Sequence, residues 1–150
     1  MKIQFDVDDK PPKKIKGRKS CWSGKEAKNV LKLREKALAA RTETGLDDCF
    51  HEKVKMKLTV YAPNIIYRKN TDDYIGDLDS LIGGILESIQ PGPTKTINED
   101  IDIDPILKDR KDVGPEIPLL VEDDAQVVQI NAEKHEGTSI HYTVIVEPYV

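Results

Sequence analysis

Four segments of the chain carry the hydrophobic pattern of β-strands. Apolar and polar residues alternate over residues 2–7 and again over residues 53–61, a period of two that is typical of a half-buried strand. Two further strands are predicted at 127–132 and 140–146. The intervening Glu136-Gly137-Thr138 favours a turn. We therefore expect the last two strands to pair as an antiparallel hairpin.

A helix is predicted from about Gly24 to Ala40. Ser23 is followed three residues later by Glu26, the spacing of a capping box, and Gly45 marks the exit. One face is partly apolar, and basic residues cover much of the remainder. The apolar positions are Ala27, Val30, Leu31 and Leu38.

The clearest amphipathic helix follows Asp77. Its apolar residues recur at spacings of three and one, which places them on one face, and they are Leu78, Leu81, Ile82, Ile85, Leu86 and Ile89. Asp77 occupies the N-cap position, and Asp79 lies in the first turn, where the helix dipole favours a negative charge. Gly83 and Gly84 inside this helix indicate close approach of another backbone or of a nucleic-acid strand, or, more simply, close packing of helix on sheet.

Residues 91–118 differ in amino-acid composition from the rest of the chain. They are rich in proline and in acidic residues, so we interpret them as an insertion of loop and short elements rather than core. The order of elements is strand, helix, strand, helix, insertion, strand, strand. This order predicts one α+β domain over residues 1–150, with a small mixed β-sheet packed against two principal helices.

Charge is distributed unevenly along the chain. The net charge is −4, yet residues 10–41 contain twelve Lys/Arg and two Glu, which leaves −14 on the remainder. This asymmetry fits a phosphate-binding patch beside an acidic, cation-binding region, although a solvated basic helix face without a partner explains it too. No apolar run is long enough to span a membrane, and the start has no apolar signal region, so a cytoplasmic location is expected.

Cysteine usage adds little to this picture. Cys21 and Cys49 are expected to be reduced thiols. A zinc site built from Cys21, Cys49 and His51 is disfavoured because paired ligand spacing is missing.

Two acidic motifs carry the candidate chemistry. Asp77-Leu78-Asp79 opens the second helix, and Glu122-Asp123-Asp124-Ala125-Gln126 precedes a strand. Mg²⁺ binds one or two carboxylates and keeps several waters that a phosphate substrate can replace. The motifs therefore point to metal-assisted hydrolysis of a phosphodiester. Taken singly, each acid also has an ordinary role as a helix cap, a first-turn acid or a turn residue.

Together the two motifs resemble those of the RusA family of Holliday-junction resolvases. The order of elements outside residues 91–118 agrees with that family as well. The resemblance implies a homodimeric, Mg²⁺- or Mn²⁺-dependent endonuclease that nicks branched DNA. By motif, Asp77, Asp79 and Asp124 would be the metal-binding catalytic residues, with Asp123 as a supporting carboxylate.

The resemblance also directs attention to the basic loop before the first helix, which is the predicted DNA contact. Its residues are Lys13, Lys14, Lys16, Arg18 and Lys19. The family's usual lysine one turn into the helix is Gly83 here, so a basic residue from 10–41 would have to replace it. A weakly active or inactive RusA-like DNA-binding protein, and an accessory protein that recruits a protein partner through residues 91–118, remain open alternatives.

Overall fold

Four strands form one mixed sheet in this computed structural model, which describes residues 1–14, 20–67, 73–93 and 103–150. Their order across the sheet is β1-β4-β2-β3. The strands are β1 (Ile3–Val7), β2 (Val54–Ala62), β3 (Val127–Glu136) and β4 (His141–Pro148). β2 runs parallel to β3 and antiparallel to β4, and β4 runs antiparallel to β1.

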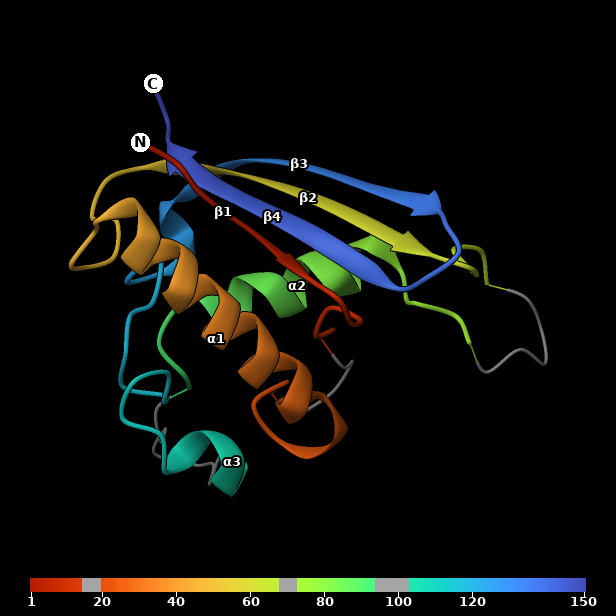
Figure 1. Cartoon of the computed structure of the whole chain (residues 1–150), viewed down its shortest axis with the longest axis horizontal. Coiled ribbons are helices and arrows are strands. Elements are labelled where there is room, and N and C mark those ends of the chain that lie inside the picture. The colour runs from red at the N-terminus through yellow and green to blue at the C-terminus, as the bar shows by residue number, and fades with distance from the viewer. Residues whose placement is uncertain (15–19, 68–72, 94–102) are drawn as a thin grey trace.

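The two long helices, α1 (Ala27–Thr44) and α2 (Leu78–Ile89), cover the same face of the sheet (Figure 1). Alternate residues of β1, β2 and β4 are buried beneath them, which is the expected result of a period-two pattern with one face in the core. Leu81, Ile85 and Ile89 of α2 are fully buried in the same core. The predicted α+β domain with a mixed sheet and two main helices is therefore confirmed.

The predicted hairpin between the last two strands is wrong. β3 and β4 are both bonded to β2, which lies between them. β2 has an unbroken apolar face from Val54 to Ala62 and takes a central position, while the more polar β3 is left at the edge. Because β2 and β3 are parallel, the connection between them must cross over, and α2 lies in that crossover.

The first helix begins differently from the prediction. Ser23 makes no capping hydrogen bond, and the carboxylate of Glu26 instead accepts from the backbone N–H of Lys13 and the side chain of Asn29. A short 3₁₀ turn, Gly24–Glu26, precedes α1. The helix continues to Thr44, four residues beyond the predicted end at Ala40. Gly45, which marked the exit in the sequence, is its C-cap, with a left-handed φ of 82°.

Arg34 of α1 is fully buried, which the sequence did not indicate. Its guanidinium donates to five backbone carbonyls, those of Ser88, Gln90, Val113, Gly114 and Ile117, at 2.6 to 3.1 Å. Two of these carbonyls belong to the C-terminal end of α2, where carbonyls lack partners within the helix. Arg34 therefore joins α1, α2 and the segment that follows α3 (Pro105–Lys108).

Part of the predicted insertion belongs to the core. Leu107 of α3 is fully buried beside Trp22 and Val30 in a second hydrophobic cluster. Val113 is also fully buried. In the described part, residues 103–118, α3 packs against α1, and the segment after it is joined to the C-terminal end of α2 through Arg34. Residues 94–102 lie outside the described residues.

Gly84 of α2 is required by the close approach of another backbone. A Cβ at this position would overlap the carbonyl group of Pro12. The partner is therefore the segment after β1, and the simpler expectation of helix-on-sheet packing does not account for this glycine. Gly83 meets only a side chain, since its added Cβ would lie 3.0 Å from Lys14 Cβ.

This contrast predicts different costs for the two adjacent glycines. Gly84→Ala should lower the free energy of unfolding by about 3 kcal/mol, because the backbone of Pro12 must move. Gly83→Ala should change it by no more than about 1 kcal/mol, since the stem of Lys14 can shift and alanine favours a helix. Urea denaturation of both variants measures the difference, and equal effects would contradict this explanation.

Among the described residues, no helix combines the length and apolar character needed to cross a membrane.

Candidate functional site

Asp77 and Asp79 are both exposed at the N-terminal end of α2. Asp77 is the N-cap residue by position, but its side chain caps no helix N–H group. Its carboxylate instead accepts a 2.6 Å hydrogen bond from the hydroxyl of Tyr74. Burial and the nearby Asp77 and Asp79 raise the pKa of Tyr74 to about 12, so Tyr74 stays a proton donor at neutral pH.

Lys134 of β3 supports this end of the site. Its ammonium donates to the hydroxyl of Tyr74 at 3.2 Å and to the carbonyls of Ile65 and Gly76. It also lies over the ring of Tyr74, 5.0 Å from the centroid. Lys134 therefore fixes the tyrosine that holds the Asp77 carboxylate.

Asp123 and Asp124 belong to a short 3₁₀ helix before β3, Asp124–Gln126. Asp123 caps it by accepting from the N–H of Ala125, and Gln126 completes a capping box. The amide of Gln126 also donates to the carbonyls of Phe50 and Glu52. Asp123 and Gln126 thus have a structural role that explains their presence without a ligand.

Asp124 is different, because its side chain is half-buried and caps nothing. Its N–H donates to the side chain of Gln90, the residue after the last turn of α2. Burial raises the pKa of its carboxyl, as do Asp123 and Glu87, while Lys14 opposes the rise. Asp124 therefore lies in an acidic environment that a cation would stabilise.

The two acidic motifs lie toward opposite ends of α2 (Figure 1). This helix has twelve residues and so is about 18 Å long. The carboxylates of Asp77, Asp79 and Asp124 accordingly do not form a compact group of metal ligands in the described part of the chain. The pair Asp77 and Asp79 suits a hydrated Mg²⁺ by itself, but a single chain does not bring all three acids to one ion.

Lys14 lies beside Gly83 of α2, the position at which the resemblance led us to expect a lysine. Its methylene stem packs against Gly83, and its N–H donates to the carbonyl of Ser80. The ammonium is exposed and lies 3.9 Å from the carboxylate of Glu87. A basic residue from the 10–41 region is therefore placed beside Gly83.

The rest of the predicted basic surface is less uniform than the sequence suggested. Lys13 is half-buried and its stem packs near Gly76, whereas Lys16, Arg18 and Lys19 lie outside the described residues. Arg34 is buried, and Arg41 donates to the carbonyl of Leu119. These two arginines are structural, so the charge balance of residues 10–41 overstates the surface available to phosphate.

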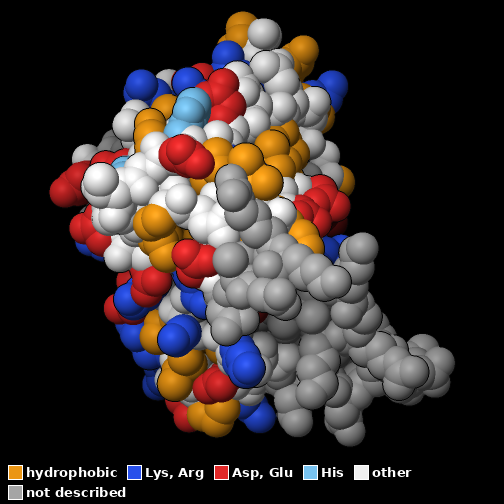
Figure 2. Space-filling view, turned by 90° about the vertical axis from the view of Figure 1, so that its right-hand side faces the viewer, with side chains coloured by type: hydrophobic (Ala, Val, Ile, Leu, Met, Phe, Trp, Pro, Cys, Tyr) orange, Lys and Arg blue, Asp and Glu red, His pale blue; other side chains and the backbone are white. Residues whose placement is uncertain are grey.

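The face nearest the N-terminal end of α2 mixes all side-chain types. Figure 2 shows acidic, basic and hydrophobic side chains interspersed among the described residues there. Tyr61, at the end of β2, stacks on His135 and His141 with centroid distances of 5.4 and 4.6 Å. The histidines therefore contribute to an aromatic cluster on the open sheet face.

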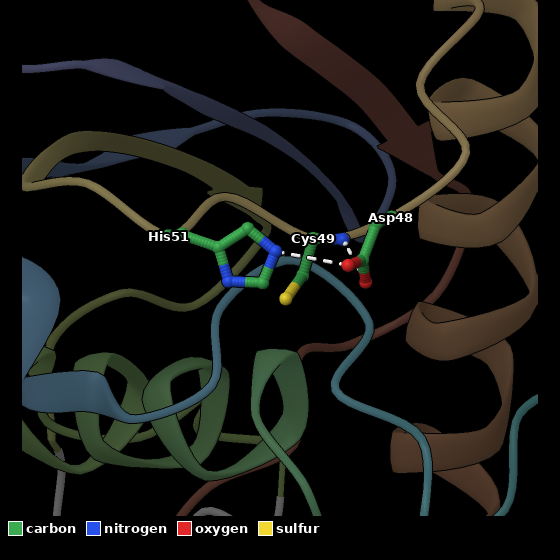
Figure 3. Close-up of side chains that lie close together, drawn as sticks. All are labelled: Asp48, Cys49 and His51. Carbon is green, nitrogen blue, oxygen red and sulfur yellow. Dashed lines mark hydrogen bonds and ion pairs between the residues drawn. The ribbon is translucent and has the colours of Figure 1, made fainter.

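A second cluster comprises Asp48, Cys49 and His51 (Figure 3). Cys49 and His51 belong to the zinc set that the sequence disfavoured, whereas Asp48 was not considered. Their ligand atoms all lie within 4.8 Å of one another, the one such group of three or more metal-ligating side chains in the described ranges. Cys21 is not part of it, since its thiol contacts Glu87 on α2. The signal in the sequence is the run Asp-Cys-Phe-His, in which Asp48 takes the place that Cys21 has in the disfavoured zinc set.

Comparison with known proteins adds no relative. No protein-family model matches the chain, and no curated protein matches it. Membership of the RusA family therefore stays a prediction from the two acidic motifs.

Proposed function

We propose that this protein is a metal-dependent endonuclease that cuts branched DNA. The observation that carries the proposal is the Asp77 carboxylate, which lies at the N-cap of α2 but caps no helix N–H group. Helix capping was the ordinary explanation of Asp77, yet its side chain caps nothing and is held by Tyr74 instead. Asp79 is exposed two residues later, so two carboxylates are available to a cation at one helix end.

Each residue at the N-terminal end of α2 would have a distinct role in the proposed cleavage of DNA. A bound Mg²⁺ would polarise the scissile phosphate and lower the pKa of a water molecule. Asp77 and Asp79 would hold the cation, and Tyr74 would orient the carboxylate of Asp77. Lys14 beside Gly83 supplies a positive charge that can contact a phosphate of the DNA backbone.

A homodimer is part of the proposal, because one chain separates the two acidic motifs by the length of α2. If all three aspartates act on one ion, Asp124 must come from a second copy. The sheet offers a surface for association at its β3 edge, where Val128 and Ile130 are 46% and 38% exposed. An exposed edge strand with apolar side chains is suited to pairing with another chain.

The direct test is cleavage of a labelled four-way junction against a linear duplex of the same sequences. Reactions contain Mg²⁺, Mn²⁺ or EDTA. We expect nicks in the junction that require a metal and that are weak or absent in the linear duplex. Absence of cutting with either metal would overturn the proposed activity.

The same samples distinguish the second candidate, a RusA-like DNA-binding protein without activity. It is favoured by Gly83, which leaves α2 without a lysine of its own. A junction-specific gel shift without cutting would support it. The shift should weaken steeply with salt, because phosphate contacts release counterions. A protein that neither binds nor cuts the junction would exclude both candidates.

A further inference from the structure

We infer that Asp48, Cys49 and His51 form a binding site for a transition-metal ion of the Zn²⁺ class. In this site the Cys49 sulfur, the His51 Nε2 and an Asp48 oxygen are the protein ligands, and a water fills the fourth position. Its three ligands are not among the aspartates of the proposed nuclease, although Glu122, which pairs with His51, directly precedes Asp123 in the chain. The inference does not depend on the proposed function.

The side chains meet the requirements of such an ion. The three ligand atoms lie within 4.8 Å of one another without any ion present, and all three side chains approach one point in Figure 3. Sulfur, imidazole nitrogen and carboxylate oxygen together suit Zn²⁺, whereas Mg²⁺ prefers oxygen ligands alone. Cys49 is 5% exposed, but Asp48 and His51 are more than half exposed, so one side stays open to water.

The second nitrogen of His51 provides an independent observation. Its Nδ1 lies 3.1 Å from the carboxylate of Glu122, while Nε2 lies 2.9 Å from Asp48. A histidine that binds a metal through one nitrogen usually donates its other N–H to a carboxylate or a carbonyl. Glu122 is therefore placed as the outer partner that orients the ring, leaving Nε2 for the metal.

The backbone around the cluster is held in position by other segments. The N–H of Phe50 donates to the carbonyl of Leu120 at 2.8 Å, and Phe50 forms a parallel bridge with Val121. Gln126 donates to the carbonyl of Phe50 from the same neighbouring segment. The ligand run and Glu122 are thus fixed relative to each other before any ion binds.

Binding would replace protons by the metal. The S–H bond of Cys49 breaks as the sulfur–metal bond forms, and Nε2 of His51 gives up any proton that it carries. These protons pass to the buffer, and the hydrogen bond between Asp48 and His51 is exchanged for two bonds to the ion. No change of oxidation state occurs.

The test is titration of reduced, untagged protein with Co²⁺, which takes Zn²⁺ positions and reports on its ligands by absorption. We expect a thiolate-to-cobalt charge-transfer band in the near ultraviolet that saturates at one thiolate-bound ion per chain and that Zn²⁺ removes and Mg²⁺ does not. Cys49→Ser should abolish the band, with its fold checked by circular dichroism. His51→Gln changes an exposed side chain and should weaken binding about tenfold or more.

Matched variants separate this site from ordinary surface pairs. Glu122→Gln should weaken Zn²⁺ binding by roughly 10–100-fold, since it removes the outer partner of His51. Glu133→Gln removes a similar carboxylate from His135, 2.9 Å away, and should change nothing. Cys21→Ser should keep the band. A wild-type protein without the band, a band that survives Cys49→Ser, or equal effects of Glu122→Gln and Glu133→Gln would overturn the assignment.

Discussion

Replacing Arg34 by methionine should lower the free energy of unfolding by at least about 3 kcal/mol, because five carbonyls, three of them buried and two partly buried, lose their donor. Methionine fills similar space but donates no hydrogen bond. It also removes the guanidinium that lies 4.7 Å from the centroid of the Trp22 ring. Chemical denaturation followed by circular dichroism measures the loss.

A second substitution tests whether hydrogen-bond geometry is the reason. Arg34→Lys keeps the positive charge but offers three donors on one nitrogen, so it should recover only part of the stability. Arg110→Met is the control, because Arg110 is a partly exposed residue that pairs with the carboxylates of Asp112 and Glu35 and donates to no backbone carbonyl among the described residues. It should leave the denaturation midpoint almost unchanged. If Arg34→Met were as mild as the Arg110 control, the bridging role of Arg34 would be wrong.

Asp79→Asn and Asp124→Asn should each reduce junction cleavage by about a hundredfold or more, because a metal ion supplies several kcal/mol to such a reaction. Each variant should still bind the junction. Since the two residues lie toward opposite ends of α2, we expect mixtures of the two variants to regain activity. In a mixed dimer with sites shared between chains, one site carries both substitutions and the other carries none.

The amount of nicking activity that the mixture regains shows whether the active sites are shared between the two chains of a dimer. Random exchange of subunits makes half of the dimers mixed, with one intact site in two, so nicking should return to about a quarter of the wild-type level. The control is a mixture of Asp77→Asn with Asp79→Asn, which belong to one helix end and should not rescue each other. Lack of recovery in the first mixture, with binding retained, would show that Asp124 does not complete a site across the dimer.

The sequence predicted helices and strands correctly where a regular spacing of apolar residues was present. The alternation in β2 and the spacing of apolar residues in α2 placed both elements correctly. The hairpin failed because a turn signal between two strands does not say which strand lies between them. The capping box failed because the carboxylate of Glu26 has other donors, in Lys13 and Asn29.

For the candidate sites too, the sequence indicated residue types but not their positions in space. The sequence drew attention to Asp77 and Asp124, but a motif carries no distance, and their placement toward opposite ends of α2 is a tertiary fact. The cluster of Asp48, Cys49 and His51 was not predicted because the sequence does not show whether neighbouring side chains turn toward one another, or that His51 pairs with Glu122 from a distant segment. The sequence did not distinguish Lys14 from the other lysines of the basic loop, and only the structure shows that its stem packs against Gly83.

By itself, the sequence determined the elements of this protein and the residue types that carry chemistry, because helix and strand periods and acidic spacing are local properties. Only the tertiary structure decided the order of the strands, the burial of Arg34 and the pairing of His51 with Glu122. The physical reason is that these features arise from contacts between distant segments. Buried carbonyls need a donor, backbones pack closely only where a glycine permits it, and either requirement can be met from anywhere in the chain.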